Sequence, residues 1–269
     1  EMIKRGFPAD LVAKRIAFFW SIGNNFFEEV ARLRAIRRIW YRILKTRFGV
    51  TDKNSLLLRC HVQTSGISLT SQEPLNNIAR ASFQALAAIF GGVQSLHVDS
   101  YDEAYSVPTE ESALLSLRTQ QIIQEETGVT NVVDPLGGSY FIESLTNDIE
   151  ERILDELTGI ENSGGYIKLI ESKNLHRKIE EYAWKQTHDI EKGVIPVVGV
   201  NKYNRDVKTP ISIFKYPEGV EEKQKNILKE LKLKRDNNKA KSSLEKLEWA
   251  CKNNGNIMVY CIECAKARC

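Results

Sequence analysis

Two short polar clusters, each directly after an apolar run, constrain the fold of this chain more than any other feature. The first reads HVQTSG at residues 61–66, and the second reads QSLHVDSYDE at residues 94–103. A long amphipathic pattern with helical spacing separates them. Strands that alternate with helices predict a parallel sheet, and in an α/β barrel polar groups at the carboxyl ends of the strands line the site. The sequence therefore predicts an α/β fold with functional groups at one edge of a sheet.

Apolar runs and helical stripes alternate over the first half of the chain. Short apolar runs predict three strands, at residues 16–22, 56–62 and 93–98. Apolar residues at steps of three and four predict a helix after each strand, with glycines at 49, 91 and 128 ending the helices. Thr109 is the expected N-cap of the third helix. Residues 129–133 predict a fourth, weaker strand.

The second half of the chain predicts helices almost throughout. Apolar stripes at residues 149–160 and 174–192 and a charged tail from residue 217 predict helices, whereas residues 194–200 form a short β-like run. A (β/α)₈ TIM barrel takes about 250 residues, but the strand-bearing part stops near residue 135. A barrel would therefore be present only as its second, C-terminal half over residues 1–140, followed by a mostly helical extension over residues 141–269. The first residue is Glu rather than Met, so we expect a segment of a longer protein.

Composition bounds the partners and the compartment. The net charge is only +3, with 38 basic against 35 acidic residues, so we expect no nucleic-acid partner. No apolar run approaches the length that crosses a bilayer, and the first residues lack a secretory pattern. We therefore expect no membrane partner and a cytoplasmic location.

The five cysteines are scattered, which argues against a disulfide framework. Cys261 and Cys264 have the C-x-x-C spacing, but a structural zinc site takes four ligands, and only Cys251 and Cys269 lie near enough in sequence to add to them. A metal or redox role is one interpretation. The simpler one, which we favour, places Cys261 and Cys264 one turn apart in a terminal helix, with no metal site.

Segments spread over the whole chain resemble one family. They are residues 26–35 (FFEEVARLRA), the first polar cluster, and residues 76–80, 91–97, 120–126, 133–140, 144–147 and 198–203. In this order they resemble the adenosylcobalamin-dependent acyl-CoA mutases, and most closely the large catalytic subunit of methylmalonyl-CoA mutase. The resemblance implies a (β/α)₈ barrel with CoA along its axis, capped by a cobalamin-binding domain. It also implies an isomerase that converts (R)-methylmalonyl-CoA to succinyl-CoA by a radical rearrangement with adenosylcobalamin. Isobutyryl-CoA, ethylmalonyl-CoA and 2-hydroxyisobutyryl-CoA are the alternative substrates.

The resemblance assigns roles to individual residues. His61 and Gln63 match catalytic positions near substrate and cofactor, and Arg15 matches a CoA contact. Gly66 matches a position that lies against the corrin, and Glu103 matches a carboxylate that accepts a hydrogen bond from the ribose. The other residues that match cofactor-binding positions are Gln94, Ser95, His97 and Ser106. Taken alone, His61 also suits a buried histidine bonded to backbone, Glu103 a turn cap, and Arg15 a solvated surface residue.

Some features of the family are changed or missing. Ile67 stands where a Trp is common, Val98 and Asp99 replace a Thr-Asn pair, and Ser106 replaces a small Ala; these changes affect the fit to cofactor and acyl group. The family's Tyr-His pair, its substrate-binding Arg and the D-x-H-x-x-G motif of the cobalamin-binding domain do not occur here. We expect the isolated chain to be inactive and to need the other barrel half and a cobalamin-binding domain or small subunit. A truncated, inactive remnant and a non-catalytic acyl-CoA or cobalamin-binding module are the alternatives.

Overall fold

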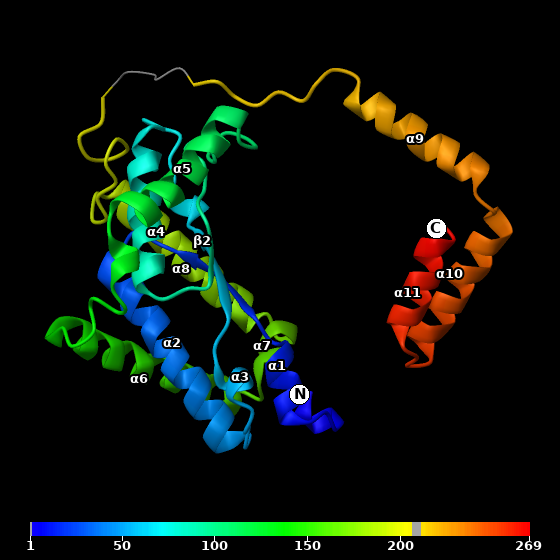
Figure 1. Ribbon diagram of the computed structural model, residues 1–269, viewed down its shortest axis with the longest axis horizontal. Coiled ribbons are helices and arrows are strands. Elements are labelled where there is room, and N and C mark those ends of the chain that lie inside the picture. Colours follow the sequence, from blue (N-terminus) through cyan, green and yellow to red (C-terminus); the bar gives the residue numbers. More distant parts are fainter. Residues whose placement is uncertain (1, 206–210) are drawn as a thin grey trace. The chain divides into compact units, whose positions relative to one another are not determined.

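The computed structural model describes residues 2–205 and 211–269 (Figure 1). The chain divides into two compact units, Glu1–Phe214 and Lys215–Cys269, called unit 1 and unit 2 below. In the part of unit 1 that is described, three parallel strands form one sheet in the order β1 (Phe18–Ile22), β2 (Cys60–Thr64) and β3 (Ser95–His97). The prediction of an α/β fold with a parallel sheet is confirmed.

Two helices connect the successive strands. They are α2 (Phe26–Arg47) and α4 (Asn76–Phe90). The second strand begins later than predicted, because residues 53–56 form the short helix α3 (Lys53–Leu56), whose N-cap Asp52 accepts a hydrogen bond from the Ser55 amide. Gly49 (φ +63°) and Gly92 (φ +73°) adopt the left-handed conformation just after α2 and α4, as expected of residues that end helices.

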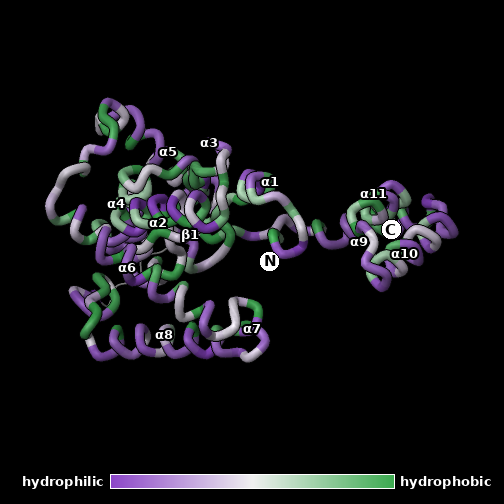
Figure 2. Tube along the Cα trace, turned by 90° about the horizontal axis from the view of Figure 1, so that it is seen from below, coloured by the Kyte–Doolittle hydropathy of each residue, from purple (hydrophilic) through white to green (hydrophobic). Residues whose placement is uncertain are grey.

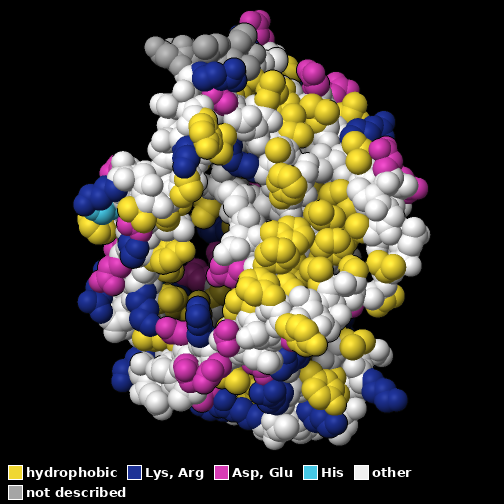
Figure 3. Space-filling view, turned by 90° about the vertical axis from the view of Figure 1, so that its left-hand side faces the viewer, with side chains coloured by type: hydrophobic (Ala, Val, Ile, Leu, Met, Phe, Trp, Pro, Cys, Tyr) yellow, Lys and Arg dark blue, Asp and Glu magenta, His cyan; other side chains and the backbone are white. Residues whose placement is uncertain are grey.

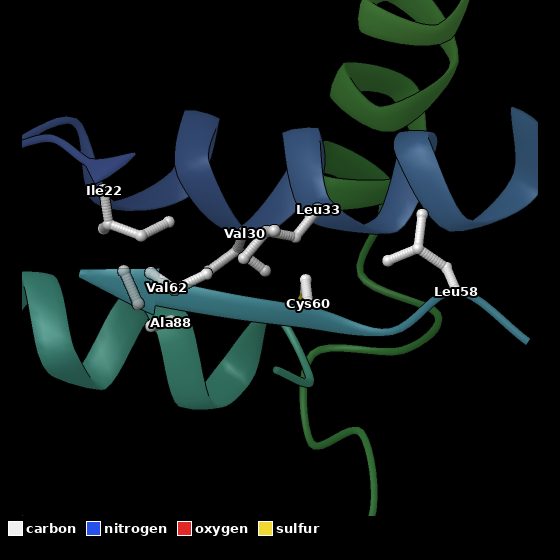
Figure 4. Close-up of a cluster of buried hydrophobic side chains, with 8 residues drawn as sticks. Ile22, Val30, Leu33, Leu58, Cys60, Val62 and Ala88 are labelled. Atoms are coloured by element: carbon white, nitrogen blue, oxygen red, sulfur yellow. The ribbon is translucent and has the colours of Figure 1, made fainter. Parts of the chain in front are cut away.

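The core lies on one face of the sheet. Its buried side chains come from β2, the segment just before it, and the neighbouring elements β1, α2 and α4. They are Ile22, Val30, Leu33, Leu58, Cys60, Val62, Ala87 and Ala88. Figure 4 draws these side chains, which come together from β1, α2, β2, α4 and the segment just before β2. Gly91 is required by this packing, because a Cβ there would collide with the Leu33 side chain. The opposite face of the sheet carries more exposed side chains, and Phe19 of β1 is 63% exposed there.

The other helices of unit 1 surround or extend this core. They are α1 (Ala9–Arg15), α5 (Glu110–Glu126), α6 (Tyr140–Asn162), α7 (Tyr166–Glu171) and α8 (Asn174–Glu191), with the short 3₁₀ helices η1 (Ile3–Arg5), η2 (Gly66–Ser68) and η3 (Val129–Asn131). Thr109 caps α5 as predicted, since its hydroxyl accepts a hydrogen bond from the Ser112 amide. In Figure 2 hydrophobic stretches gather around α2, α4 and β1, whereas α8 is largely hydrophilic.

Helix α6 packs along α2 through ion pairs. Arg34 of α2 contacts Asp134 and Glu143, each at 2.6 Å. Glu150 of α6 is buried and lies 2.9 Å from Arg38 and 2.7 Å from Arg42. The division of the barrel part from the helical extension at residue 140 stays a prediction.

Two predicted β segments are wrong. Residues 129–131 form η3 instead of a strand, because Gly128 (φ +71°) turns the chain directly after α5, and Val133 is left 97% exposed. In residues 194–200 the described structure has turns and a single bridge, Val198 to Lys202. The Asn201 side chain holds this turn, with hydrogen bonds to the Val197 amide and to the Ile190 and Ile195 carbonyls.

Unit 2 contains α9 (Val220–Lys234), α10 (Asn237–Lys252) and α11 (Ile257–Lys266). Helices α10 and α11 pack side by side. Cys261 and Cys264 lie one turn apart in α11, as the simpler interpretation predicted. Among the described residues, no helix has both the length and the apolar character needed to cross a membrane.

Candidate functional site

The open face of the sheet carries two rows of mainly polar side chains, set by the strand register. Phe19, His61 and Ser95 are paired across the strands in one row, and Ser21, Gln63 and His97 in the next. Side chains alternate between the faces of a strand, so these rows lie opposite the core. Each strand therefore contributes to one continuous surface that α2 and α4 leave uncovered.

His61 lies at the centre of the first row. Its ring stacks on Phe19, with ring centroids 5.2 Å apart and an 8° interplanar angle. Its Nδ1 atom forms a hydrogen bond with the Ser95 hydroxyl. The imidazole is thus held by two side chains of the open face rather than by backbone, and Nε2 is the ring nitrogen left for other chemistry.

The second row leads to the carboxyl edge of the sheet, where Asp99 is the central residue. Gln63 Nε2 donates to Asp99 Oδ1 at 2.7 Å, and the Asp99 amide donates to Thr64 Oγ1 at 2.7 Å. His97 Nε2 lies 3.6 Å from Asp99 Oδ1. The Asp99 side chain is fully buried, and its Oδ2 atom has no hydrogen-bond partner in the described part of the chain. An unpartnered buried oxygen is unusual and calls for an explanation.

Gly66 follows β2 beside this carboxylate. A Cβ built on Gly66 would lie 3.6 Å from Glu103 Cγ and 3.7 Å from both Asp99 Oδ2 and Glu103 Oε1. These are ordinary contacts, and the φ angle of Gly66 is not in the left-handed region. The packing of this chain therefore does not itself require a glycine here. The next residue, Ile67, is 93% exposed.

Glu103 has a perturbed carboxyl group. Partial burial and the negative charge of Asp99 raise its pKa above the ordinary value, and the charge of Asp102 adds to this, whereas His97 opposes it. Asp102 is buried, and its Oδ2 atom accepts a hydrogen bond from the Thr109 amide at 3.2 Å. This edge of the sheet can accept hydrogen bonds from hydroxyl or amide groups, and the carboxyl group of Glu103 holds its proton to a higher pH than an ordinary glutamate does.

Two polar residues of α4 position the loops at this edge. Gln84 is buried; its Oε1 atom accepts from the Ser65 amide at 2.8 Å, and its Nε2 atom donates to Ser68 Oγ at 2.7 Å and to Asn24. Asn77 is also buried and donates to the carbonyls of Thr70 and Tyr101, each at 2.9 Å. The helix therefore fixes the loops after all three strands.

The structure brings most of the predicted site residues together and places the others elsewhere in unit 1. Those on the open face or at its carboxyl edge are His61, Gln63, Gly66, Ser95, His97 and Glu103. Ser106 lies in the loop after β3, where its amide donates to the Asp102 carbonyl. Gln94 lies at the opposite, amino edge, because it precedes β3, and it accepts from the Cys60 amide at 2.8 Å. Arg15 is exposed at the end of α1, before β1 begins.

Sequence reasoning missed three residues of this site as functional groups. Phe19 shares a row with His61, and the alternation along β1 could have placed it there. Asp99 follows His97 by two residues, which places it at the same edge. Gln84 gave no such signal, because its role depends on loops that only the tertiary structure brings to α4.

A large apolar cavity of about 520 Å³ lies elsewhere in unit 1. Side chains of α1, α2 and α6 line it, among them Ala13, Ile36, Trp40, Leu44 and Ile153. Its lining residues are all apolar, whereas ligand sites place a few polar groups to orient the ligand.

In the described residues no group of three or more His, Cys, Asp or Glu is arranged to hold a metal ion. Figure 3 shows that hydrophobic side chains also form an exposed area on one face of the molecule.

Known proteins of one family are similar to this chain along its whole length. The family described as methylmalonyl-CoA mutase matches residues 1–269. The chain is 44% identical to a probable mitochondrial methylmalonyl-CoA mutase of Caenorhabditis elegans and 42% identical to the mitochondrial methylmalonyl-CoA mutase of Homo sapiens, covering 99% of this chain and 36% of each relative. It is 42% identical to the large subunit of 2-hydroxyisobutanoyl-CoA mutase of Aquincola tertiaricarbonis, covering 99% of this chain and 48% of that subunit.

Proposed function

The chain belongs to the methylmalonyl-CoA mutase family, and from this premise we propose that it supplies the second half of the (β/α)₈ barrel of an adenosylcobalamin-dependent acyl-CoA mutase. The proposed reaction is the isomerisation of (R)-methylmalonyl-CoA to succinyl-CoA. The chain spans 36% of the length of its methylmalonyl-CoA mutase relatives. The complete activity therefore needs the other half of the barrel and a cobalamin-binding domain, on the same or a separate polypeptide.

The observation that carries the proposal is the polar open face of the sheet. A sheet whose connecting helices α2 and α4 cover one face, and whose other face carries His61, Gln63 and His97, has the arrangement of an arc of barrel wall. The inward side chains of such a wall lie inside the closed barrel, and the loops after the strands form the active end. Further strands pairing with β1 and β3 would close the barrel and turn these rows into its lining.

The residues at the carboxyl edge fit a large bound cofactor. Gly66 presents backbone without a side chain although the chain's own packing would accept one, and Ile67 leaves an apolar side chain in solvent. Glu103 places a carboxylate oxygen next to that surface, where it would accept hydrogen bonds from ribose hydroxyls. The Asp99 carboxylate beside it is fully buried. Adenosylcobalamin, when bound, supplies the organic radical that starts the carbon-skeleton rearrangement.

His61 and Gln63 lie deeper on the open face, where they would contact the acyl group and exclude water from it. The ring of His61 is oriented by Phe19 and Ser95, and the amide of Gln63 by Asp99. Fixing two polar groups in this way costs no reorganisation when substrate arrives. Arg15, at the other edge, would reach only a distal part of CoA.

A second substrate is favoured by one specific comparison. The 2-hydroxyisobutanoyl-CoA mutase large subunit is as similar to this chain as the human methylmalonyl-CoA mutase, at 42% identity. That relative is named a large subunit, which supports a separate small subunit as one form of the missing part. Isobutyryl-CoA and ethylmalonyl-CoA are further acyl groups to test.

The test is a mutase assay on the reconstituted protein. Adenosylcobalamin and (R)-methylmalonyl-CoA are added to the chain alone and to the chain together with the polypeptides encoded beside it, and 2-hydroxyisobutyryl-CoA is assayed in parallel. We expect succinyl-CoA only in the mixture. Absence of turnover with every substrate, from a mixture that forms a stable complex, would overturn the proposal and favour a remnant or a binding module.

A further inference from the structure

Three of the five cysteines gather at the end of α11, in unit 2 and outside the candidate site. Cys264 is buried, at 7% exposure, whereas Cys269 is exposed and Cys261 is intermediate. The Cys269 thiol donates to the carbonyl of Ala240 in α10 at 3.3 Å. Burial and the neighbouring Cys269 thiol raise the pKa of the Cys264 thiol. One of these two thiols is therefore buried and the other is accessible at the same end of α11.

The backbone brings Cys264 and Cys269 close together. The Cys269 amide donates to the Cys264 carbonyl at 3.1 Å, and the Arg268 amide donates to the Ala265 carbonyl at 3.1 Å. Arg268 has a φ of +57°. These two hydrogen bonds around a left-handed residue define a Schellman motif, in which the side chains at the first and last positions frequently contact one another. The contact is usually between two hydrophobic groups, but here both positions are cysteines.

The alternative pair, Cys261 and Cys264, is less suitable for a bond. Both lie within α11, and residues three apart on a helix have Cβ atoms about 5–6 Å apart. A disulfide requires Cβ atoms about 3.5–4.5 Å apart. That bridge would unwind a turn of the helix, whereas the Cys264–Cys269 pair meets where the helix has already ended.

We propose that Cys264 and Cys269 form a dithiol–disulfide site that reacts with small disulfides such as oxidised glutathione. The exposed Cys269 thiolate attacks one sulfur of the oxidant, forms a mixed disulfide and releases one glutathione thiolate. Cys264 then gives its proton to solvent and attacks the Cys269 sulfur, which releases the second glutathione thiolate. The protein loses two electrons and two protons, and one glutathione disulfide becomes two thiols.

Oxidation would change the end of α11 locally. The Cys269 S–H group would no longer donate to the Ala240 carbonyl, so the contact between the end of the chain and α10 would be lost. In its place a covalent bond would close the last turn of α11. We therefore expect the amides of Arg268 and Cys269 to exchange with solvent more slowly in the oxidised protein.

The experiment maps disulfides in the full chain after equilibration with mixtures of reduced and oxidised glutathione. Free thiols are blocked with iodoacetamide, and the protein is cleaved with trypsin. Cleavage after Lys252, Lys266 and Arg268 leaves Cys261 and Cys264 in one peptide and separates Cys269 from it. A Cys264–Cys269 bond therefore attaches Cys269 to that peptide, whereas a Cys261–Cys264 bond closes the peptide on itself.

We expect Cys269 to be attached to the peptide, with Cys261 carrying the blocking group. Cys261→Ser and Cys251→Ser should leave the bond and its midpoint glutathione ratio unchanged, whereas Cys264→Ser should stop the reaction at the mixed disulfide of Cys269. An internal Cys261–Cys264 disulfide, or a mixed disulfide at Cys269 in the wild-type chain at every glutathione ratio, would overturn the proposal.

Discussion

At the residue scale, the buried carboxyl group of Asp99 and the more exposed carboxyl group of Glu103 both lie beside Gly66. Asp99 Oδ2 and Glu103 Oε1 both lie 3.7 Å from the Cβ position of Gly66. Replacing Asp99 by Asn puts an amide where an unpartnered buried oxygen now lies and removes a negative charge next to Glu103. We expect Asp99→Asn to raise the free energy of unfolding at neutral pH by about 1 kcal/mol. Urea denaturation measures this, and a clear loss of stability would contradict our description of the site.

The raised pKa of Glu103 makes a separate prediction about pH. The folded chain holds this proton to a higher pH than the unfolded chain does, so the stabilisation is complete below the ordinary glutamate pKa and is lost as the pH rises through the raised value. Glu103→Gln removes this dependence, and the stability of the variant relative to wild type should increase from pH 4 to pH 8.

The control for this experiment is Glu171→Gln, since Glu171 is exposed and lies far along the chain from Asp99 and Glu103. Urea midpoints of the three proteins across this pH range give the comparison. Parallel curves for Glu103→Gln and wild type would show that Asp99 and burial do not act on the Glu103 carboxyl.

At the scale of elements, α4 holds the loops of the site by hydrogen bonds from its buried face. Gln84→Leu keeps the volume but leaves the Ser65 amide and the Ser68 hydroxyl without this partner. We expect a loss of about 1–3 kcal/mol in the free energy of unfolding, together with faster amide exchange at residues 65–68. Gln124→Leu, on the exposed side of α5, is the matched control and should change stability little. Equal effects of the two substitutions would contradict the positioning role.

The ion pairs between α6 and α2 give an asymmetric prediction. Glu150 has a side-chain exposure of 6%, against 44% for Arg38 and 53% for Arg42. Removing both arginines leaves a buried charge unpaired and should cost about 3–5 kcal/mol, whereas Glu150→Gln leaves two arginines that water can solvate and should cost much less. Thermal unfolding of Arg38→Ala/Arg42→Ala and of Glu150→Gln measures both. The reverse order would show that the carboxylate is not the buried partner.

The strands and helices of the first half could be predicted because their patterns are local. The three apolar runs predicted the three strands of the sheet, and Thr109 predicted the start of α5. The run at residues 129–133 failed as a strand because apolar composition alone does not show whether a neighbouring strand is available for pairing. Gln84 and the unpartnered oxygen of Asp99 depend on contacts between residues far apart in sequence, and no pattern in the chain indicates them.

At the scale of the whole molecule, the proposed function depends on what binds at the carboxyl edge of the sheet. Unit 1 has a sheet of three strands in its described residues, and exposed strand edges are a site for pairing with further chain. The proposed mutase closes the barrel there and places the cofactor against Gly66. Closing the barrel should shield the side-chain rows around His61 and Gln63 from solvent, whereas the chain by itself leaves them uncovered.

The most direct measurement is therefore the adenosylcobalamin affinity of the reconstituted protein with Gly66→Val, followed by absorbance titration. Gly159→Val in α6 is the control, because a Cβ at Gly159 meets nothing within 4 Å and a Cβ at Gly66 makes only ordinary van der Waals contacts. We predict at least about a tenfold increase in the adenosylcobalamin Kd for Gly66→Val, with an unchanged unfolding midpoint. Gly159→Val should leave this Kd unchanged. A Gly66→Val assembly that is folded and binds the cofactor as tightly as wild type would contradict the placement of cobalamin at this edge.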